Sequence, residues 1–495
     1  MERVSGAGAA SSVEGRSGSA GAANAGPASP TPAAAIPATA AVARKLRRAR
    51  LLIEYPFVLA VIWGDNDVER APVVAGPPLV VAASPETVAR GTAGGDAVTG
   101  WSEAAGCAVL AVPGIIIGVM LLRRVGAGLG VGAAAGAGAA AGIGWFYSSL
   151  LLDTSVRPVY PERVLAVADG LVTLAASRLT AQPGTWGLRW ASDGRGGLAV
   201  LGPVTREDRR EVVRPVLGGD PPEPGSAAVL DAGPFDPDPG ARGLPFEDVD
   251  VPGPLGRYPA WFVPADGDTW VVLVHGRGGA RREALRVLPA LHALGHPQLV
   301  ISYRNDVGAP PSPDGHYHLG DTEWEDVEAA VRYAVDRGAR RIVLFGWSMG
   351  GAVTGAFLDR SAEAARVAAV VWDAPLVDWR ATLRQQARNR RLPAALSPLA
   401  SAVTSRRIGI DFDRFDLVRH PPAVRPPTLV VHSAGDTAVP VTASRALAAA
   451  APALGWPLRY LEVPLVEHTA SWNADPAAYE RAVTSFLGEV LRTSG

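Results

Sequence analysis

Cysteine is almost absent from this sequence, and neither sign of charge is in excess. Among the 495 residues there is one cysteine, Cys107, which excludes an internal disulfide framework and any cysteine-rich metal site. Lysine and arginine together number 47 and aspartate and glutamate 48, so the formal net charge of -1 excludes a basic, nucleic-acid-binding protein. The chain is long enough for one large domain with additional segments.

Large apolar side chains are nearly missing from residues 1–42, which consist mainly of alanine, glycine, serine and proline. Such a segment buries too little apolar surface to offset the entropy that is lost on ordering. It is followed by the basic cluster ARKLRRAR and by LLIEYPFVLAVIWG, in which Glu54 and Pro56 argue against a membrane span. We therefore predict a disordered, low-complexity leader over residues 1–103.

Charged side chains are also scarce in residues 104–152. Two apolar stretches, 104–122 and 125–152, flank a pair of arginines, and each is long enough to cross about 30 Å of hydrocarbon as a helix. The second stretch closes with WFY, aromatic residues of the kind that gather at a membrane interface. The region predicts one or two transmembrane helices, with a buried core hairpin as the alternative.

Basic residues favour the cytoplasmic side of a membrane, which bears on the orientation of this region. If Arg123 and Arg124 lie in the cytoplasm, whatever follows the second stretch lies outside. The basic cluster at 43–50 also favours the cytoplasm, and a single span at 125–152 satisfies both signals. We therefore expect a membrane-anchored protein whose C-terminal part is extracytoplasmic.

Residues 153–246 contain strand and turn signals but no chemical motif. The segment TWGLRWASDGRGGLAVLGPV (185–204) alternates in polarity around a turn, which predicts a β-hairpin. The segment GGDPPEPGSAAVLDAGPFDPDPGARG (218–243) is rich in proline, aspartate and glycine, which indicates a linker or surface excursion. We predict a β-rich segment that ends in a linker.

From residue 247 to residue 495, short apolar strands alternate with helical segments. The helix RREALRVLPALHALG precedes the strand QLVISY, and the helix TEWEDVEAAVRYAVDRG precedes the strand RIVLFGWS. Strands separated by helices of this length form crossover units, and these build a parallel sheet with helices on both faces. The predicted fold class is α/β.

A single complete G-x-S-x-G pattern, formed by Gly346, Ser348 and Gly350, lies in GWSMGG. It follows a buried-strand pattern and precedes the small-residue start of a helix. This is the setting of a strained turn that projects a nucleophilic serine from a sheet, and the glycines leave room for the turn. A serine in an ordinary tight turn is the alternative.

A nucleophilic serine needs a histidine base and an acid that orients it, and both are expected on loops after later strands. His468 in LEVPLVEHTASWN follows the last strand, whereas His420 precedes a proline pair and His432 lies within a strand. For the acid, Asp436 in VVHSAGDTAVP is preferred over Asp373 in VVWDAP. Turn or helix capping is the alternative role for either aspartate.

The loop HGRGG (275–279) directly follows the strand TWVVLV. Its glycines allow close backbone approach, so the backbone N–H groups of Arg277 and Met349 are the candidate donors to a developing oxyanion. Gly276 supports this loop. His275 is expected to position the loop rather than to transfer protons, and a packed loop residue is the alternative.

Residues 247–495 resemble the α/β-hydrolase superfamily, in its serine aminopeptidase-like or prolyl-oligopeptidase-like branch, through HGRGG, GWSMGG, HSAGDTAVP and EHTASWN. The chain also resembles membrane-anchored actinobacterial hydrolases, from which it departs by its long leader and its second apolar stretch. The resemblance implies an α/β-hydrolase fold and neither a metal nor an organic cofactor. The site residues that it implies are the triad Ser348, His468 and Asp436 and the oxyanion donors Arg277 and Met349.

The segment after DAPLVDW, about residues 379–425, interrupts the strand pattern and predicts a small helical lid. The sequence HYH (316–318) lacks a third metal ligand nearby, so we interpret it as a loop at the rim of the site. The predicted function is a serine hydrolase of an ester, thioester or peptide bond in a small-molecule, lipid or peptide substrate. An acyltransferase on the same fold and a noncatalytic interaction protein are the alternatives.

Overall fold

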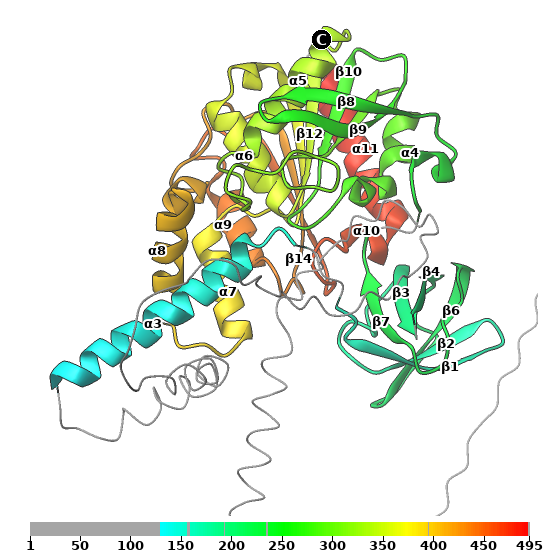
Figure 1. Ribbon diagram of the computed structural model, residues 1–495. Coiled ribbons are helices and arrows are strands. Elements are labelled where there is room, and N and C mark those ends of the chain that lie inside the picture. The colour runs from blue at the N-terminus through cyan, green and yellow to red at the C-terminus, as the bar shows by residue number, and fades with distance from the viewer. Residues whose placement is uncertain (1–128, 156–158, 193, 234–235, 395, 494–495) are drawn as a thin grey trace, which may run out of the picture. The chain divides into compact units, whose positions relative to one another are not determined.

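The computed structural model of the protein describes residues 129–155, 159–192, 194–233, 236–394 and 396–493 (Figure 1). The predicted leader at 1–103 and the first apolar stretch at 104–122 lie outside the described residues. The described chain contains two β-sheets, one of seven strands and one of eight, which follow each other in the sequence.

The first described element is the helix α3 (Leu129–Leu152), which occupies most of the second stretch that was predicted to span a membrane. Among the helices that the structure describes, none is both long enough and apolar enough for a membrane crossing. The predicted span therefore stays a prediction. At the end of α3, Leu151 and Leu152 are buried and belong to the apolar core of the larger sheet.

The seven-stranded sheet is antiparallel, in the order β2-β1-β7-β3-β4-β6-β5, and an additional pairing joins its first strand, β2, to its next-to-last strand, β6. Its interior contains alternate residues of several strands, among them Val172, Leu188 and Leu230. The strands are β1 (Glu162–Ala168), β2 (Leu171–Ala175), β3 (Trp186–Ser192), β4 (Arg195–Leu201), β5 (Arg206–Glu207), β6 (Glu211–Gly219) and β7 (Ala227–Asp231).

The hairpin predicted at 185–204 is confirmed, because β3 and β4 pair in antiparallel register from Trp186 with Leu201 to Ser192 with Arg195. The linker predicted at 218–243 is wrong in part. Its residues 227–231 form β7, which pairs with both β1 and β3. The apolar segment AAVLD is short and flanked by glycine and proline, which indicated a turn. It nevertheless forms a strand, which buries Ala228 and Leu230.

The eight-stranded sheet has the order β8-β9-β11-β10-β12-β13-β14-β15, with β8 and β9 antiparallel to their neighbours and the other pairs parallel. This is the mostly parallel sheet that the α/β prediction required. The strands are β8 (Glu247–Gly253), β9 (Gly256–Val263), β10 (Thr269–Val274), β11 (Gln298–Ile301), β12 (Arg341–Trp347), β13 (Val367–Asp373), β14 (Thr428–Ser433) and β15 (Leu458–Val463).

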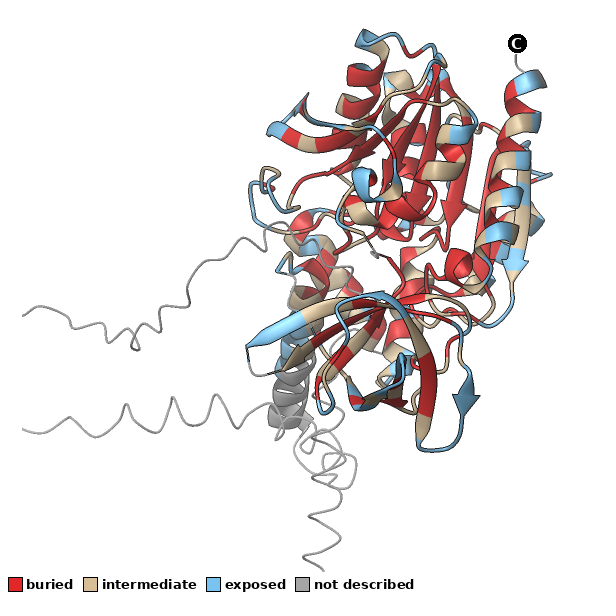
Figure 2. Cartoon of the chain, turned by 90° about the vertical axis from the view of Figure 1, so that its right-hand side faces the viewer, coloured by how far each residue is buried: buried red, intermediate tan, exposed pale blue. Residues whose placement is uncertain are grey.

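Helices cover both faces of this sheet, and its central strands are buried (Figure 2). Successive strand residues point to opposite faces. Val272 therefore packs in the cluster with the helices α5 (Trp324–Asp336), α6 (Met349–Arg360) and α9 (Val441–Ala450). Val271 packs in the cluster with α4 (Leu288–Ala293) and α11 (Pro476–Thr493). The continuous apolar strands thus reflect burial on both faces.

Between β13 and β14 the chain leaves the sheet and forms α7 (Trp379–Asn389), α8 (Leu396–Ile408) and the short 3-10 helix η4 (Phe412–Phe415). These elements occupy the segment for which a helical lid was predicted. The remaining short helices are η1 (Pro239–Arg242), η2 (Arg281–Arg286), η3 (Ala362–Arg366) and α10 (Ser471–Ala474).

Candidate active site

Ser348 lies in the sharp turn between β12 and α6, with φ at 51° and ψ at -115°. A positive φ is unfavourable for a residue with a side chain, so the turn is strained. A Cβ atom on Gly346 would lie 2.8 Å from the carbonyl oxygen of Gly350, and one on Gly350 would lie 2.2 Å from that of Val274. The strand-turn-helix setting predicted for GWSMGG is confirmed, and only glycine fits on either side of the serine.

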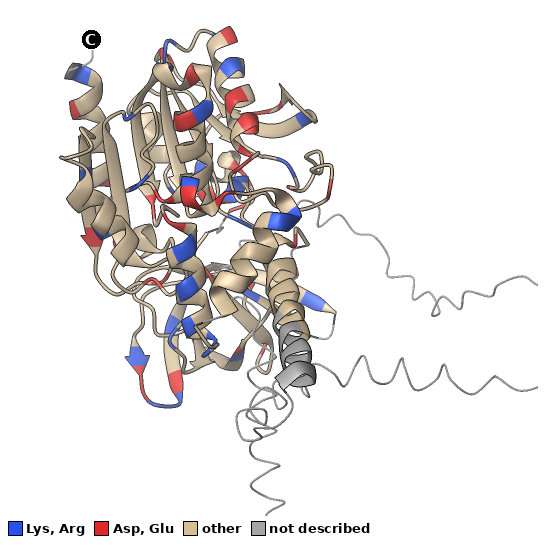
Figure 3. Cartoon of the chain, turned by 90° about the vertical axis from the view of Figure 1, so that its left-hand side faces the viewer, with Lys and Arg blue, Asp and Glu red and all other residues tan. Residues whose placement is uncertain are grey.

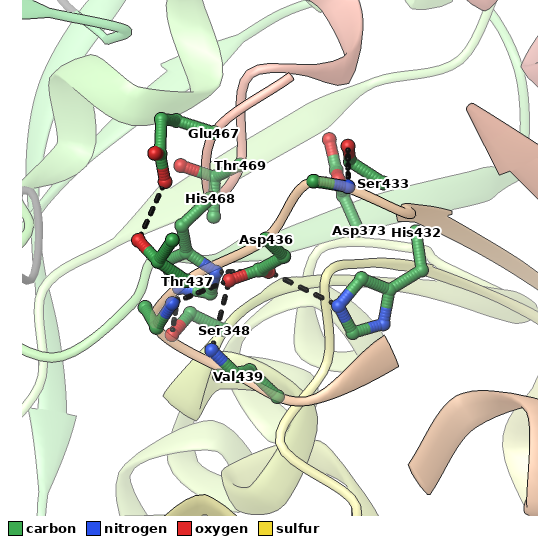
Figure 4. A network of polar contacts seen from close by, with 12 residues as sticks. Ser348, Asp373, His432, Ser433, Asp436, Thr437, Val439, Glu467, His468 and Thr469 are labelled. Carbon is green, nitrogen blue, oxygen red and sulfur yellow. Dashed lines mark hydrogen bonds and ion pairs between the residues drawn. The ribbon is translucent and has the colours of Figure 1, made fainter. Parts of the chain in front are cut away.

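The three residues predicted as a triad form one chain of hydrogen bonds (Figure 4). Ser348 Oγ lies 2.7 Å from His468 Nε2, and His468 Nδ1 lies 2.6 Å from Asp436 Oδ2. All three are buried. Asp436 follows β14 and His468 follows β15, so the carboxyl ends of neighbouring parallel strands bring these distant positions together.

The carboxylate of Asp436 is held by four donors. Its Oδ1 accepts the backbone N–H groups of Ala438 and Val439 at 2.7 and 2.8 Å, and its Oδ2 also contacts His432 Nε2 at 3.0 Å. Burial by itself would raise the pKa of Asp436, but the charge of His468 and the hydrogen bonds of both histidines lower it far below its usual range. Asp436 is therefore ionised at neutral pH.

The imidazole of His468 is oriented by Asp436. With Nδ1 donating to the carboxylate, Nε2 faces Ser348 and can accept the hydroxyl proton. Burial would lower the pKa of His468, but the adjacent Asp436 charge outweighs it and raises the pKa above its ordinary value. His468 is therefore neutral, and able to accept a proton, mainly above that raised pKa.

His432 is the residue of the site that the sequence interpretation missed. It was set aside as a strand residue, and it does lie in β14, but its Nε2 contacts Asp436 while its Nδ1 lies 2.8 Å from Ser444 Oγ. The signal that could have identified it is the spacing of four residues from Asp436 across the end of the strand. His420, by contrast, is exposed at the surface.

Asp373, the alternative acid, lies at the end of β13 and is fully buried. Its Oδ1 accepts a hydrogen bond from Ser471 Oγ at 3.3 Å, and burial raises its pKa. The structure thus places Asp436 rather than Asp373 in hydrogen-bond contact with His468 Nδ1.

The loop 275–279 lies against the nucleophile, because a Cβ atom on Gly276 would come within 3.0 Å of Ser348 Cβ. The N–H of Gly276 donates to Glu283 Oε2 at 2.8 Å. His275 is buried, and its Nδ1 lies 2.9 Å from the carbonyl oxygen of Gly276 while its Nε2 lies 2.7 Å from Asp306 Oδ2. Both ring nitrogens therefore face acceptors, one within the loop and one in the segment after β11.

His275 is further fixed by the ring of Tyr303, which stacks on it with centroids 4.3 Å apart. Burial would lower the pKa of His275, but Asp306 and the Gly276 carbonyl outweigh it and raise the pKa. A protonated imidazole satisfies both acceptors at once. The geometry is that of a residue that holds the loop.

The loop that carries His468 is anchored by the segment between β2 and β3 of the smaller sheet. The N–H of Glu467 donates to Gln182 Oε1 at 2.9 Å, and Arg178 forms an ion pair with Glu467 at 2.8 Å. Asn473 Nδ2 donates to the carbonyl oxygen of Thr185 at 2.8 Å. Residues 153–246, in which the sequence showed no chemical motif, thus contact the segment that contains His468.

The two histidines of HYH contact an aspartate of their own loop and an arginine of α8. His318 Nε2 lies 3.1 Å from Asp314 Oδ2, and His316 Nε2 lies 3.0 Å from Arg407 Nη2. Across the residues that the structure describes, no three metal-binding side chains come together in a cluster.

Two family models match this chain. Residues 312–494 match the prolyl oligopeptidase family, and residues 163–231 match a domain of unknown function (DUF8805). Two uncharacterized proteins from different strains of Mycobacterium tuberculosis are each 28% identical over 294 residues, which cover 58% of this chain and 89% of the relative.

Several solved structures are similar to this chain. An esterase from Pyrococcus furiosus is 18% identical with a TM-score of 0.41, and it covers 52% of this chain and 97% of its own. An alpha-beta hydrolase from Vibrio vulnificus is 20% identical with a TM-score of 0.38, and it covers 49% of this chain and 81% of its own. The family match and the strand order agree with the motifs: residues 312–494 are similar to the prolyl oligopeptidase family, and the eight-stranded sheet has the mostly parallel order expected of an α/β-hydrolase.

Proposed function

We propose that the protein is a serine hydrolase that cleaves an ester, thioester or amide bond through an acyl-enzyme intermediate. The observation that carries this proposal is the unbroken chain of short contacts from Ser348 through His468 to Asp436. A serine hydroxyl at a strained turn, with a base on one side and an ionised acid behind that base, is the arrangement that activates a weak nucleophile.

In the proposed reaction, Ser348 Oγ attacks the acyl carbonyl carbon while His468 Nε2 accepts the hydroxyl proton. Asp436 stabilises the imidazolium that forms and keeps Nδ1 as the donor. The imidazolium then protonates the leaving group, whose bond to the acyl carbon breaks. A water molecule, deprotonated by the same imidazole, hydrolyses the acyl-enzyme and regenerates Ser348.

The developing oxyanion requires donors that are already in place. We assign this role to the backbone N–H groups of Arg277 and Met349. Met349 is the first residue of α6, where backbone N–H groups have no acceptor within the helix and the helix dipole favours negative charge. Arg277 follows Gly276, which packs on Ser348. In this proposal His275 acts on the loop and not on the substrate.

The active serine can be tested with a fluorophosphonate probe applied to the full-length protein and mapped by intact and peptide mass. We expect one adduct on Ser348 and none in Ser348→Ala. Because the neutral form of His468 is the base and its pKa is raised, the labelling rate should fall on acidification, with a midpoint above about pH 6.5. Absence of labelling in folded protein, or an adduct that persists in Ser348→Ala, would contradict the proposal.

A pocket lies between the end of α3 and the lid helices α7 and α8. Leu151, Leu383 and Ala400 are among its apolar lining residues. Gln386 also lines it and donates to the carbonyl oxygen of Ala438, two residues after Asp436, at 2.7 Å. We infer that this pocket receives an apolar acyl chain, because it is apolar and adjoins the loop of the acid.

A bulky residue in this pocket should shorten the acyl chain that is accepted. For Ala400→Trp we expect kcat/KM to fall by about tenfold for a p-nitrophenyl octanoate ester while the acetate ester is hydrolysed at the original rate. The matched control is Ala394→Trp, because Ala394 is exposed and precedes α8. Equal losses for both esters would show that the pocket does not hold the acyl chain.

A further inference from the structure

The side chain of Arg277 binds the C-terminal end of α3. Its Nε donates to the carbonyl oxygen of Leu151 at 3.0 Å, and its Nη2 donates to those of Leu150 and Asp153 at 3.0 and 3.2 Å. The last carbonyl groups of a helix have no partner within the helix, and a cation is favourable at this end of the helix dipole. One residue of the loop after β10 therefore caps a helix that begins about 150 positions earlier in the chain.

Other contacts fix the same end of α3. Its last residue, Leu152, is fully buried, and the carbonyl oxygen of Leu152 accepts the N–H of Tyr317 at 3.2 Å. From the lid helix α8, Arg407 donates to the hydroxyl groups of Ser148 and Ser149 at 3.1 and 2.9 Å. The guanidinium of Arg407 also lies 4.2 Å from the centre of the Trp145 ring. The helix end is thus tied both to the loop 275–279 and to the lid.

Charge is absent from α3, which is tan along its described part in Figure 3. Its partners supply the charges: Arg277 from the loop after β10 and Arg407 from α8. Hydrogen bonds from a charged donor are stronger than those between neutral groups. An apolar helix is therefore held at its end by cationic side chains of the hydrolase fold.

The contact between α3 and Arg277 affects catalysis because the backbone N–H of Arg277 is the proposed oxyanion donor. An oxyanion donor acts only within about 2.7–3.1 Å of the oxygen, and a misplacement of about 1 Å is costly. The neighbouring Gly276 is already held by Glu283. The Arg277 side chain fixes the residue that carries the proposed donor.

We propose that the end of α3 belongs to the active site and that Arg277 is a positioning residue, which places its own backbone N–H by anchoring its side chain to the α3 carbonyls. This inference rests on the proposed serine hydrolase function. It extends the catalytic machinery beyond the hydrolase fold, since the oxyanion loop is held in part by a helix that precedes the smaller sheet.

The test uses the full-length chain, with turnover expressed per serine labelled by the fluorophosphonate probe. For Arg277→Ala we expect kcat to fall by about 10- to 100-fold with little change in KM. The fall is smaller than for a deleted oxyanion donor, because this substitution displaces the backbone N–H without removing it. The affinity for a trifluoromethyl ketone, which mimics the tetrahedral intermediate, should fall by a similar factor. A purely structural role would reduce the labelled fraction but not the turnover of each labelled site.

Two variants control this experiment. Arg406→Ala removes an exposed arginine of α8 beside Arg407, so we expect its kcat to stay within about threefold of the original value. Arg277→Lys keeps the charge but loses the fork of donors, and an intermediate kcat is expected. This second variant decides the question should Arg277→Ala fail to fold, since an unchanged kcat in Arg277→Lys would overturn the inference.

A double-mutant cycle tests whether Arg277 acts through α3. Leu152→Ala loosens the buried helix end, so it should lower kcat alone but have no further effect in the Arg277→Ala background. Additive losses would refute coupling through the helix. The two proposals fail separately: turnover that survives in Ser348→Ala refutes the serine hydrolase, whereas its loss together with a normal kcat in Arg277→Ala refutes only the role of α3.

Discussion

Replacement of His468 by alanine should lower kcat by about 10⁶-fold, because the residues of a Ser-His-Asp triad act as one unit and the loss of the base removes most of its effect. In this protein His468 Nε2 is the group in hydrogen-bond contact with Ser348 Oγ, at 2.7 Å. Without it the hydroxyl keeps its proton, and only the oxyanion donors and substrate binding remain. The measurement is kcat on a p-nitrophenyl ester, with the fluorophosphonate labelling rate as a second readout.

His420→Ala is the matched control for this substitution. His420 is exposed in the chain between η4 and β14, so its loss should leave both readouts unchanged. The thermal midpoint of each variant separates catalysis from folding, since His468 is buried and its removal can leave a cavity. If folded His468→Ala kept more than about one-hundredth of the original kcat, another base would have to be sought.

The triad could be predicted because each of its residues stands beside a strong local signal. A buried strand followed by GWSMGG defines the turn at Ser348. The strand before Asp436 is buried throughout, and the strand before His468 mixes apolar and charged residues. Parallel strands end at one edge of a sheet, so strand order alone brings these three loops together. The same reasoning could not identify His432, because its contact with Asp436 depends on which way a side chain points in β14.

The partners of the site from outside the hydrolase fold could not be predicted. Gln182 and Arg178, in the smaller-sheet segment, contact Glu467 beside the base, and the carbonyl groups at the end of α3 accept hydrogen bonds from Arg277. Contacts to a backbone carbonyl or N–H leave no pattern in the sequence, because every residue offers these groups. The strand β7 was missed for a related reason, since proline and glycine around a short apolar run indicate turns as readily as the ends of a strand.

Replacement of Asp436 by asparagine should lower kcat by about 10⁴-fold while leaving the fold intact. Its Oδ1 accepts two backbone N–H groups, so the asparagine oxygen should take that place and its NH₂ group the place of Oδ2. There the amide would face the nitrogens of His468 and His432 as a donor. His468 would then keep its proton on Nε2, in the tautomer that cannot accept the proton of Ser348.

Asp373→Asn is the matched comparison, because Asp373 is also a buried aspartate at the end of a neighbouring parallel strand. It contacts Ser471 rather than His468, so its substitution should change kcat by less than about tenfold. The pH dependence gives a second criterion: the Asp436 charge raises the pKa of His468, so the residual activity of Asp436→Asn should persist to lower pH. A large loss in Asp373→Asn with near-normal turnover in Asp436→Asn would reverse the assignment of the acid.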